Sequence, residues 1–296
     1  MKILLTGGTG FIGRRLIQKL SDEGHELICL TRSKERAASI LGQHVAFVTE
    51  LSELGQAGLD AVINLAGEPI VDQRWSDARK TLLEESRINM TANLISWLEG
   101  QEQKPEVLVS GSAIGFYGSY PGDEPLDEAS GFKEGFTHDL CDRWESEARK
   151  AEGLGIRVCL IRTGIVLGEG GALNKMLLPF KLGLGGQVGS GHQWMSWIHI
   201  DDEVEVITML LTQTELAGVF NLTAPQPVTN YEFAKALGKQ LNRPTILPLP
   251  AFMAKLMLGE GAELLLEGQR VFPERLLEAG YKFNYLELDE ALKAIL

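Results

Sequence analysis

The amino-terminal stretch MKILLTGGTGFIGRRLI restricts the possible folds of this chain more than any other feature. Its glycines can be counted in two ways. Gly8, Gly10 and Gly13 give G-x-G-x-x-G, whereas Gly7, Gly10 and Gly13 give G-x-x-G-x-x-G, and both spacings occur in dinucleotide-binding proteins. The glycines alone do not decide between the two spacings.

The same stretch predicts a site for an anion. A short apolar run precedes the glycines and a helical pattern follows them, so the turn leads directly into a helix amino terminus. The first turn of a helix has unpaired N–H groups and the positive end of the dipole. Glycines at such a turn leave room for a pyrophosphate, and the strand, turn and helix together indicate a dinucleotide site.

Strand and helix patterns alternate along most of the chain. Strands are expected at residues 2–6, 26–31, 45–48, 60–66, 106–110 and 156–162, and helices at 11–20, 34–41, 76–98 and 137–154. Beyond this part, we expect a helix at 172–182, strands at 219–222 and 245–247, and interrupted helix over 252–277. This order predicts an α/β protein: a Rossmann-like doubly wound parallel sheet with a smaller carboxyl-terminal α/β lobe.

The expected organisation has two parts. Residues 1–165, with contributions from 196–225, form the dinucleotide-binding part, and residues 166–296 form a substrate or lid lobe. Eight glycines fall between Gly168 and Gly191, which is typical of a loop that can move.

Composition excludes several classes of protein. A net charge of −12 argues against nucleic acid as the main partner. No apolar run approaches the ~18 residues of a membrane span, and the start of the chain does not read as a signal peptide. Three widely spaced cysteines show no metal-ligand pattern. We therefore expect a cytoplasmic protein, monomeric or homodimeric, with no membrane, nucleic-acid or metal partner.

The end of the second strand indicates which dinucleotide is bound. An NAD-binding protein usually places a carboxylate there for the ribose 2′-hydroxyl. Here the strand ends L-T-R-S, and Arg32 can hold a 2′-phosphate with two hydrogen bonds. The sequence therefore predicts NADP(H), although a solvent-exposed arginine without a ligand is the alternative.

Five further motifs resemble those of extended short-chain dehydrogenases/reductases. They are T-G-G-T-G-F-I-G at 6–13, N-L-A-G at 64–67, S-G-S-A-I-G-F-Y-G at 110–118, R-T-G-I-V-L-G at 162–168 and S-W-I-H-I-D-D at 196–202. The strings L-C-D-R-W-E and L-G-E-G-A-E-L-L-L-E-G-Q-R-V-F-P more closely resemble the epimerase-family branch that ends in a small domain of unknown function. The resemblance covers essentially the whole chain.

The resemblance assigns the cofactor-binding residues. It implies that Gly7, Gly10 and Gly13 are the functional glycines, and that the cofactor contacts the strand ends and the loops after them. The residues implied are Thr6, Gly7, Gly10, Phe11, Ile12, Gly13, Arg32, Asn64, Ala66, Gly67 and Ser110.

The catalytic pattern of the resembled family is incomplete. Its members use a Tyr-x-x-x-Lys pair, because a tyrosine of pKa near 10 needs an adjacent cation to exchange protons at neutral pH. Two alignments of the helix after Phe136 are possible, and they place either Thr137 and Cys141 or Asp139 and Arg143 at the two positions. Asp139 and Arg143 equally suit a surface ion pair. The later match Tyr231 to Lys235 lacks the structural context and is interpreted as chance.

Other residues can replace the missing pair. Ser112 is expected to orient the substrate oxygen, and Tyr117 is the leading candidate for proton donor, with His138 as another. A tryptophan and histidine group (Trp194, Trp197, His199) and a basic group (Arg74, Trp75, Arg79, Lys80, Arg87) could each contact a ligand. Core packing for the first and a solvated helix face for the second are the competing interpretations.

Two functions remain open at this point. The first is an NADP(H)-dependent oxidoreductase or epimerase that acts on an alcohol or ketone carbon of a small molecule, such as a sugar nucleotide. The second is a non-catalytic NADP(H)-binding protein with a regulatory or redox-sensing role, which the missing Tyr-Lys pair favours.

Overall fold

A computed structural model describes residues 1–120 and 122–296. Its main sheet has seven strands, and every neighbouring pair is parallel. The strands are β1 (Lys2–Thr6), β2 (Glu26–Leu30), β3 (Ala46–Val48), β4 (Ala61–Asn64), β5 (Val107–Ala113), β7 (Arg157–Thr163) and β11 (Gly218–Leu222). Their order across the sheet is β11-β7-β5-β4-β1-β2-β3. The predicted Rossmann-like sheet is confirmed, with β11 as a seventh strand beyond the six that the alternating pattern gave.

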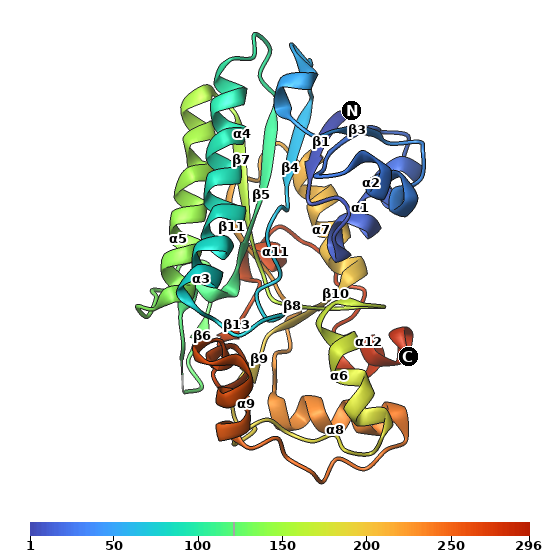
Figure 1. The fold of residues 1–296 in the computed structure, drawn as a ribbon, viewed down its shortest axis with the longest axis vertical. Coiled ribbons are helices and arrows are strands. Elements are labelled where there is room, and N and C mark those ends of the chain that lie inside the picture. Colours follow the sequence, from blue (N-terminus) through green and yellow to red (C-terminus); the bar gives the residue numbers. More distant parts are fainter. Residues whose placement is uncertain (121) are drawn as a thin grey trace.

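Helices cover both faces of this sheet (Figure 1). The helices of this part are α1 (Phe11–Asp22), α2 (Lys34–Leu41), α3 (Asp77–Glu84), α4 (Met90–Glu99), α5 (Phe136–Arg149), α7 (Ile200–Thr212) and α11 (Glu274–Glu278). A π-helical turn, Glu85–Asn89, joins α3 to α4, so the long helix expected at 76–98 forms with one widened turn. Short 3-10 turns lie at Leu51–Leu54, Ile114–Tyr117, Lys150–Leu154 and Glu260–Ala262.

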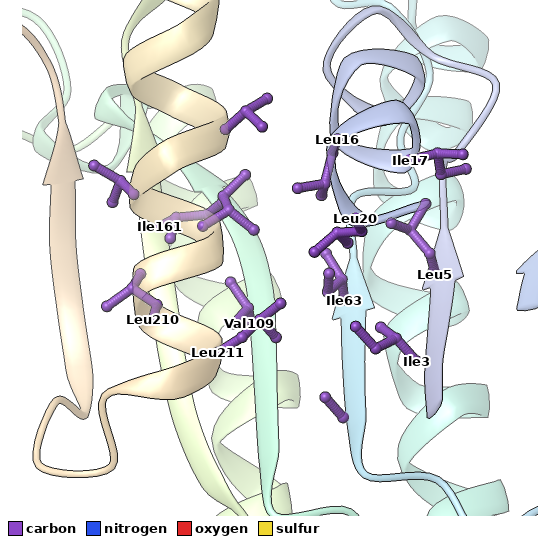
Figure 2. Packing of buried hydrophobic residues seen from close by; sticks show 14 of the residues in the cluster. Ile3, Leu5, Leu16, Ile17, Leu20, Ile63, Val109, Ile161, Leu210 and Leu211 are labelled. Carbon is purple, nitrogen blue, oxygen red and sulfur yellow. The ribbon is translucent and has the colours of Figure 1, made fainter. Parts of the chain in front are cut away.

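Apolar side chains recurring at helical spacing explain why these helices pack on the sheet. Leu16, Ile17 and Leu20 of α1 point toward the sheet in Figure 2, and Leu210 and Leu211 of α7 do the same. They meet alternate strand residues such as Ile3, Ile63 and Ile161. The other face carries a second buried cluster formed with α4 and α5. The strands are therefore buried on both sides, as their continuous apolar runs predict.

The second lobe lies beyond the carboxyl ends of the strands, at the lower end of Figure 1. It contains α6 (Gly171–Lys181), α8 (Asn230–Leu241), α9 (Ala251–Leu258), α10 (Glu263–Leu266) and α12 (Leu288–Ile295). Small two-stranded sheets connect it to the first part, formed by β8 (Ile165–Leu167) with β10 (Trp197–His199), β9 (Trp194–Met195) with β12 (Val228–Thr229), and β6 (Pro125–Leu126) with β13 (Arg270–Val271). The strand expected at 245–247 is wrong, because residues 243–248 form no regular element and only Leu249 makes a bridge, to Val188.

The order of the strands fixes where a ligand can bind. The chain runs from β1 outward to β2 and β3, then returns to β4 on the other side of β1. In open α/β sheets, ligands bind beyond the carboxyl ends of the strands at this point of reversal. The glycine turn after β1 and the loop after β4 therefore border the expected cleft.

Candidate functional site

The glycine turn has a geometry that only glycine allows. Gly7 adopts a φ of +73°, and a Cβ there would lie 2.5 Å from the carbonyl oxygen of Leu65. Gly10 donates a 2.9 Å backbone hydrogen bond to Gly7, and a Cβ on Gly13 would lie 2.4 Å from the Gly7 carbonyl oxygen. Gly7, Gly10 and Gly13 thus contact one another through their backbones. This geometry favours the G-x-x-G-x-x-G spacing.

The amino terminus of α1 is open to an anion. No side chain caps the helix, and its first turn has no acidic residue. Arg14 is exposed in that turn, while Phe11 and Ile12 are half-buried. The ring of Phe11 packs against Gly168, Gly170 and Gly171, where added Cβ atoms would approach it to between 2.8 and 3.4 Å. The segment after β8 therefore lies against the start of α1, beside the predicted pyrophosphate position.

Three of the expected cofactor residues form a buried polar cluster. The Thr6 hydroxyl donates to Oδ1 of Asn64 at 2.7 Å, and Nδ2 of Asn64 donates to the hydroxyls of Ser110 and Thr91 at 3.2 and 2.8 Å. Thr6 also accepts a hydrogen bond from the backbone N–H of Ala66. Because Thr6, Asn64 and Ser110 are buried, their side chains tie together the ends of β1, β4 and β5. A cofactor in the cleft would lie above this layer.

Two arginines hold the loop after β4 in position by hydrogen bonds to its backbone. Arg87 donates to the backbone oxygen of Glu68, and its guanidinium lies 3.0 Å from where a Cβ on Gly67 would stand. Arg79 is buried, and it donates to the backbone oxygen of Pro69. The interpretation of this basic group as a solvated helix face is therefore wrong for Arg79. Both arginines shape the loop that borders the cleft.

Arg32 stands at the opposite side of the expected adenosine position, beyond the end of β2. Its side chain is 93% exposed, and its only ion pair among the described residues joins Nη1 to Oε1 of Glu68 at 3.0 Å. Glu68 also lies 3.6 Å from Nη1 of Arg79. Sequence reasoning missed Glu68, although it directly follows the N-L-A-G motif. A carboxylate and a guanidinium thus face each other where the 2′ position of a ribose is expected.

Ser112, near the end of β5, belongs to a buried network of charged groups. Its hydroxyl donates to Oε1 of Glu145 at 2.7 Å. Arg162 of β7 donates two hydrogen bonds to the same carboxylate, from Nε to Oε1 at 2.8 Å and from Nη2 to Oε2 at 3.0 Å. The side chains of Ser112, Glu145 and Arg162 are all buried. Such a two-point contact fixes the carboxylate in position. The sequence motifs L-C-D-R-W-E and R-T-G-I-V-L-G contained Glu145 and Arg162, but gave no sign that they form a pair.

Tyr117 is part of the same network and is completely buried. Its hydroxyl donates to Oδ1 of Asn221 at 2.7 Å and accepts from Nη1 of Arg162 at 3.1 Å. Burial raises the pKa of Tyr117 to about 12, although the Arg162 charge opposes this shift. A phenol with both hydrogen-bonding partners inside the protein is badly placed to exchange protons with a substrate. The geometry counts against the expected proton-donor role.

The places of the missing pair hold no activated group. In the first alignment, Thr137 and Cys141 lie buried on α5, and burial raises the pKa of the Cys141 thiol to about 12. In the second alignment, Asp139 and Arg143 do not pair, because Nη1 of Arg143 contacts Glu84 at 3.0 Å. The surface ion pair expected between them is therefore wrong.

His138 is also held in place by contacts within the protein. Its Nδ1 lies 2.6 Å from the carbonyl oxygen of Phe116, and its ring stacks on Phe132 with 3.7 Å between ring centres. Tyr231 and Lys235 lie on α8 in the second lobe, where Thr229 caps the helix. The hydroxyl of that cap accepts the backbone N–H of Glu232.

The three members of the tryptophan and histidine group have separate structural roles. Trp197 is completely buried and donates to the backbone oxygen of Gln226, so core packing is the correct interpretation for it. Trp194 donates to Asp123 and contacts Arg270 through its ring. His199 caps α7 by accepting the N–H of Asp201 at 3.1 Å, and burial lowers its pKa.

A buried glutamate close to the end of β7 was not anticipated. Glu203, in the first turn of α7, has no exposed surface, and its Oε1 accepts from the hydroxyl of Thr163 at 2.8 Å. Its Oε2 has no partner among the described residues. Burial raises the pKa of Glu203 to about 8, so the carboxyl is neutral at pH 7.

Two kinds of site are not found in the described part of the chain. Residues 1–120 and 122–296 contain no group of three histidine, cysteine or acidic side chains that could hold a metal ion. None of their helices has the length and apolar character that crossing a bilayer requires.

The chain forms two cavities of about 520 Å³ each, and the second reaches Phe11 and Gly168 at the start of α1. They flank α1 and α7 and reach the carboxyl-terminal residues, with Arg15, Gln18 and Asp201 lining both. Neither cavity is lined by Ser112 or by the Gly7 turn.

Comparison with known proteins agrees with this architecture. The family described as "NAD dependent epimerase/dehydratase family" matches residues 3–223, and a domain of unknown function, DUF1731, matches residues 249–295. The chain is 43% identical to "Epimerase family protein SDR39U1 homolog, chloroplastic" of Arabidopsis thaliana, covering all of this chain and 87% of that protein. It is 35% identical to "Epimerase family protein YfhF" of Bacillus subtilis, covering all of this chain and 98% of that protein.

Solved structures agree as well. The human epimerase family protein SDR39U1 (isoform2), crystallised with NADPH, aligns with a TM-score of 0.90 at 38% identity, over 100% of this chain and 99% of that one. A nucleoside-diphosphate sugar epimerase from Corynebacterium glutamicum aligns with a TM-score of 0.79 at 30% identity, over 99% of this chain and 57% of that one. The chain therefore belongs to the NAD dependent epimerase/dehydratase family, and it ends in the DUF1731 domain.

Proposed function

We propose that this protein binds NADP(H) across the carboxyl ends of β1, β2 and β4. The glycine turn supports this, because Cβ atoms at Gly7 and Gly13 would clash with neighbouring backbone, so glycine lets the turn pack closely beside an uncapped helix amino terminus. The NADPH in the human SDR39U1 structure is a second support. Residues 1–165 with 196–225 form the proposed cofactor-binding part, and 166–296 the proposed substrate lobe.

The proposed preference for NADP(H) over NAD(H) rests on Arg32. The guanidinium is almost fully exposed, so a 2′-phosphate can replace Glu68 as its partner. A doubly charged phosphate is the stronger partner, because exposed ion pairs between single side chains contribute only about 0–1 kcal/mol. Glu68 would then compete with the phosphate for Arg32.

The proposed reaction is hydride exchange between the nicotinamide, which supplies this chemistry when bound, and an alcohol or ketone carbon. The observation that carries it is the Ser112 hydroxyl, which stands at the end of β5 with Glu145 fixed behind it. During oxidation of an alcohol, the substrate hydroxyl proton passes to Ser112 Oγ while the serine proton passes to the Glu145 carboxylate. Arg162 fixes the orientation of Glu145 for this transfer through its two-point contact.

A screen of alcohols, ketones and sugar nucleotides, followed through nicotinamide absorbance, tests this reaction. Ser112→Ala should abolish any turnover found, and Ser112→Thr should keep part of it, because threonine retains the hydroxyl. Turnover that is unchanged in Ser112→Ala would reject the proposed role.

The second candidate is an NADP(H)-binding protein without turnover. It is favoured by one observation: Tyr117 and His138, the alternative acid-base groups, are both held by hydrogen bonds within the protein. Binding of NADPH without turnover across the whole screen would favour this candidate. The proposed compartment is the cytoplasm, which agrees with three buried free cysteines.

A further inference from the structure

Two segments of the second lobe contain no acidic residue, although the chain has 40 of them and a net charge of −12. The segments are residues 170–200 and 233–259. An even distribution would place about eight acidic residues in segments of this combined length. Six lysines and arginines remain in them, namely Lys175, Lys181, Lys235, Lys239, Arg243 and Lys255. These two segments are therefore positively charged in an acidic protein.

The same two segments expose unusually many large apolar side chains. Nine of the 17 exposed large apolar residues lie in them, with between 42% and 73% of each side chain accessible. These are Leu178, Leu182, Leu184, Ile246, Leu247, Phe252, Met253, Leu256 and Met257. Isolated exposed apolar residues are ordinary on a protein surface, whereas a concentration of this kind indicates a binding surface.

The two segments run side by side, which places these residues on neighbouring parts of the second lobe. Arg243 donates from Nε to the backbone oxygen of Lys181 at 2.9 Å. Further along, Leu249 donates its N–H to Gln187, and Gly189 donates to Leu249, both at 2.8 Å. This pairing brings the end of α6 and the following loop against the stretch that leads into α9.

Helix α9 continues this surface. The exposed apolar residues of this helix form two pairs one turn apart, Phe252 with Leu256 and Met253 with Met257. They therefore share one exposed face, while Ala254 is buried beneath. Lys255 stands exposed among them. We call the nine apolar residues together with Lys181, Arg243 and Lys255 the basic apolar surface. Figure 1 shows α6 and α9 at the end of the molecule that lies opposite the amino terminus.

We propose that the basic apolar surface docks the protein onto an anionic lipid bilayer. Exposed leucine, methionine and phenylalanine that can enter the boundary of the acyl chains, surrounded by lysine and arginine, are the features of interfacial binding. Lys181, Arg243 and Lys255 make no ion pair with any described acidic side chain, so their charges are available to lipid headgroups.

The charge pattern favours a lipid surface over a second copy of this chain. A two-fold symmetric contact would place the same basic surface against itself, and like charges would repel without an acidic residue between them. The net charge of −12 does not prevent docking, because interactions beyond about 8–10 Å are screened at physiological salt. The proposal departs from the expectation of no membrane partner, which rested on the lack of a spanning segment and of a signal peptide.

Vesicle co-sedimentation of the full chain tests the proposal. The probes are vesicles of phosphatidylcholine alone and vesicles with about a third phosphatidylglycerol. Wild type should bind the anionic vesicles and should be released by high salt. The variant Lys181→Gln/Arg243→Gln/Lys255→Gln should lose more than about tenfold in partitioning, and Phe252→Asn/Leu256→Asn should lose a similar factor.

Matched variants on other surfaces serve as controls. Leu82→Asn/Leu286→Asn changes two exposed leucines elsewhere, and Arg36→Gln/Lys282→Gln changes exposed cations outside the basic apolar surface. Both should bind vesicles like wild type, and the thermal midpoint of every variant shows whether it is folded. The proposal is overturned if wild type does not bind anionic vesicles. It is also overturned if the control variants lose as much binding as the surface variants, or if the surface variants change only self-association or capture of an acidic protein.

Discussion

Ser112 donates a 2.7 Å hydrogen bond to Oε1 of Glu145, which lies 33 residues further along the chain on α5. Arg162 of β7 holds the same carboxylate from the other side. These three residues join β5, β7 and α5 beneath the expected substrate position. The positions expected for the family's tyrosine and lysine lie on the same helix, α5, and hold other residues.

Glu145→Gln should destabilise the protein by about 3 kcal/mol or more, because it leaves the Arg162 charge buried without a counter-ion. The double variant Glu145→Gln/Arg162→Met should recover part of this loss, since it also removes that charge. Urea unfolding of the wild type, both single variants and the double variant measures the coupling. Strictly additive losses would show that the two side chains do not act as a pair.

Tyr117→Phe should lower the free energy of unfolding by about 1–3 kcal/mol, because it leaves the buried Asn221 and Arg162 groups without a partner. It should leave NADPH affinity unchanged. Chemical denaturation and a fluorescence titration measure the two quantities. If Tyr117→Phe keeps wild-type stability but loses turnover, the result would instead support Tyr117 as the proton donor.

Sequence patterns predict the sheet, its helices and the glycine turn because these depend on local spacing and burial. The charged network could not be predicted in this way. Arg162 ends an apolar strand, and Glu145 lies on a helix rich in charge, so only the packing of α5 on β7 shows that they meet. Tyr117 illustrates the same limit, because its position after β5 suggested an accessible hydroxyl and the fold buries it.

Glu203 should make stability depend on pH. Its pKa is about 8 in the folded chain against 4.5 for the free side chain, so the folded state keeps a proton that the unfolded state loses between these values. The stabilisation that this proton gives the folded state is therefore complete below pH 4.5, and it declines as the pH rises toward 8. Glu203→Gln should gain on the order of 2–4 kcal/mol over wild type at pH 8 and little at pH 5.

Denaturant unfolding of the wild type and Glu203→Gln across this pH range measures that gain. The glutamine still accepts the Thr163 hydrogen bond, so the comparison isolates the ionisation. A gain that does not grow between pH 5 and pH 8 would contradict the assignment.

Glu68→Gln should tighten NADPH binding by about three- to tenfold, because it removes the carboxylate that competes with the 2′-phosphate for Arg32. Binding of NADH should change little. Glu26→Gln is a suitable control, because Glu26 is the first residue of β2, at the end of that strand away from Arg32. It pairs with Lys2. Weaker NADPH binding in Glu68→Gln would mean that the carboxylate supports the cofactor.

The account depends most on NADP(H) being held through Arg32 beside the glycine turn. Nicotinamide fluorescence titrations of wild type and Arg32→Asp with NADPH and NADH test this directly. The account predicts that wild type binds NADPH at least about tenfold more tightly than NADH, and that Arg32→Asp loses or reverses this preference. Equal affinity of wild type for the two cofactors, or an unchanged preference in Arg32→Asp, would contradict it.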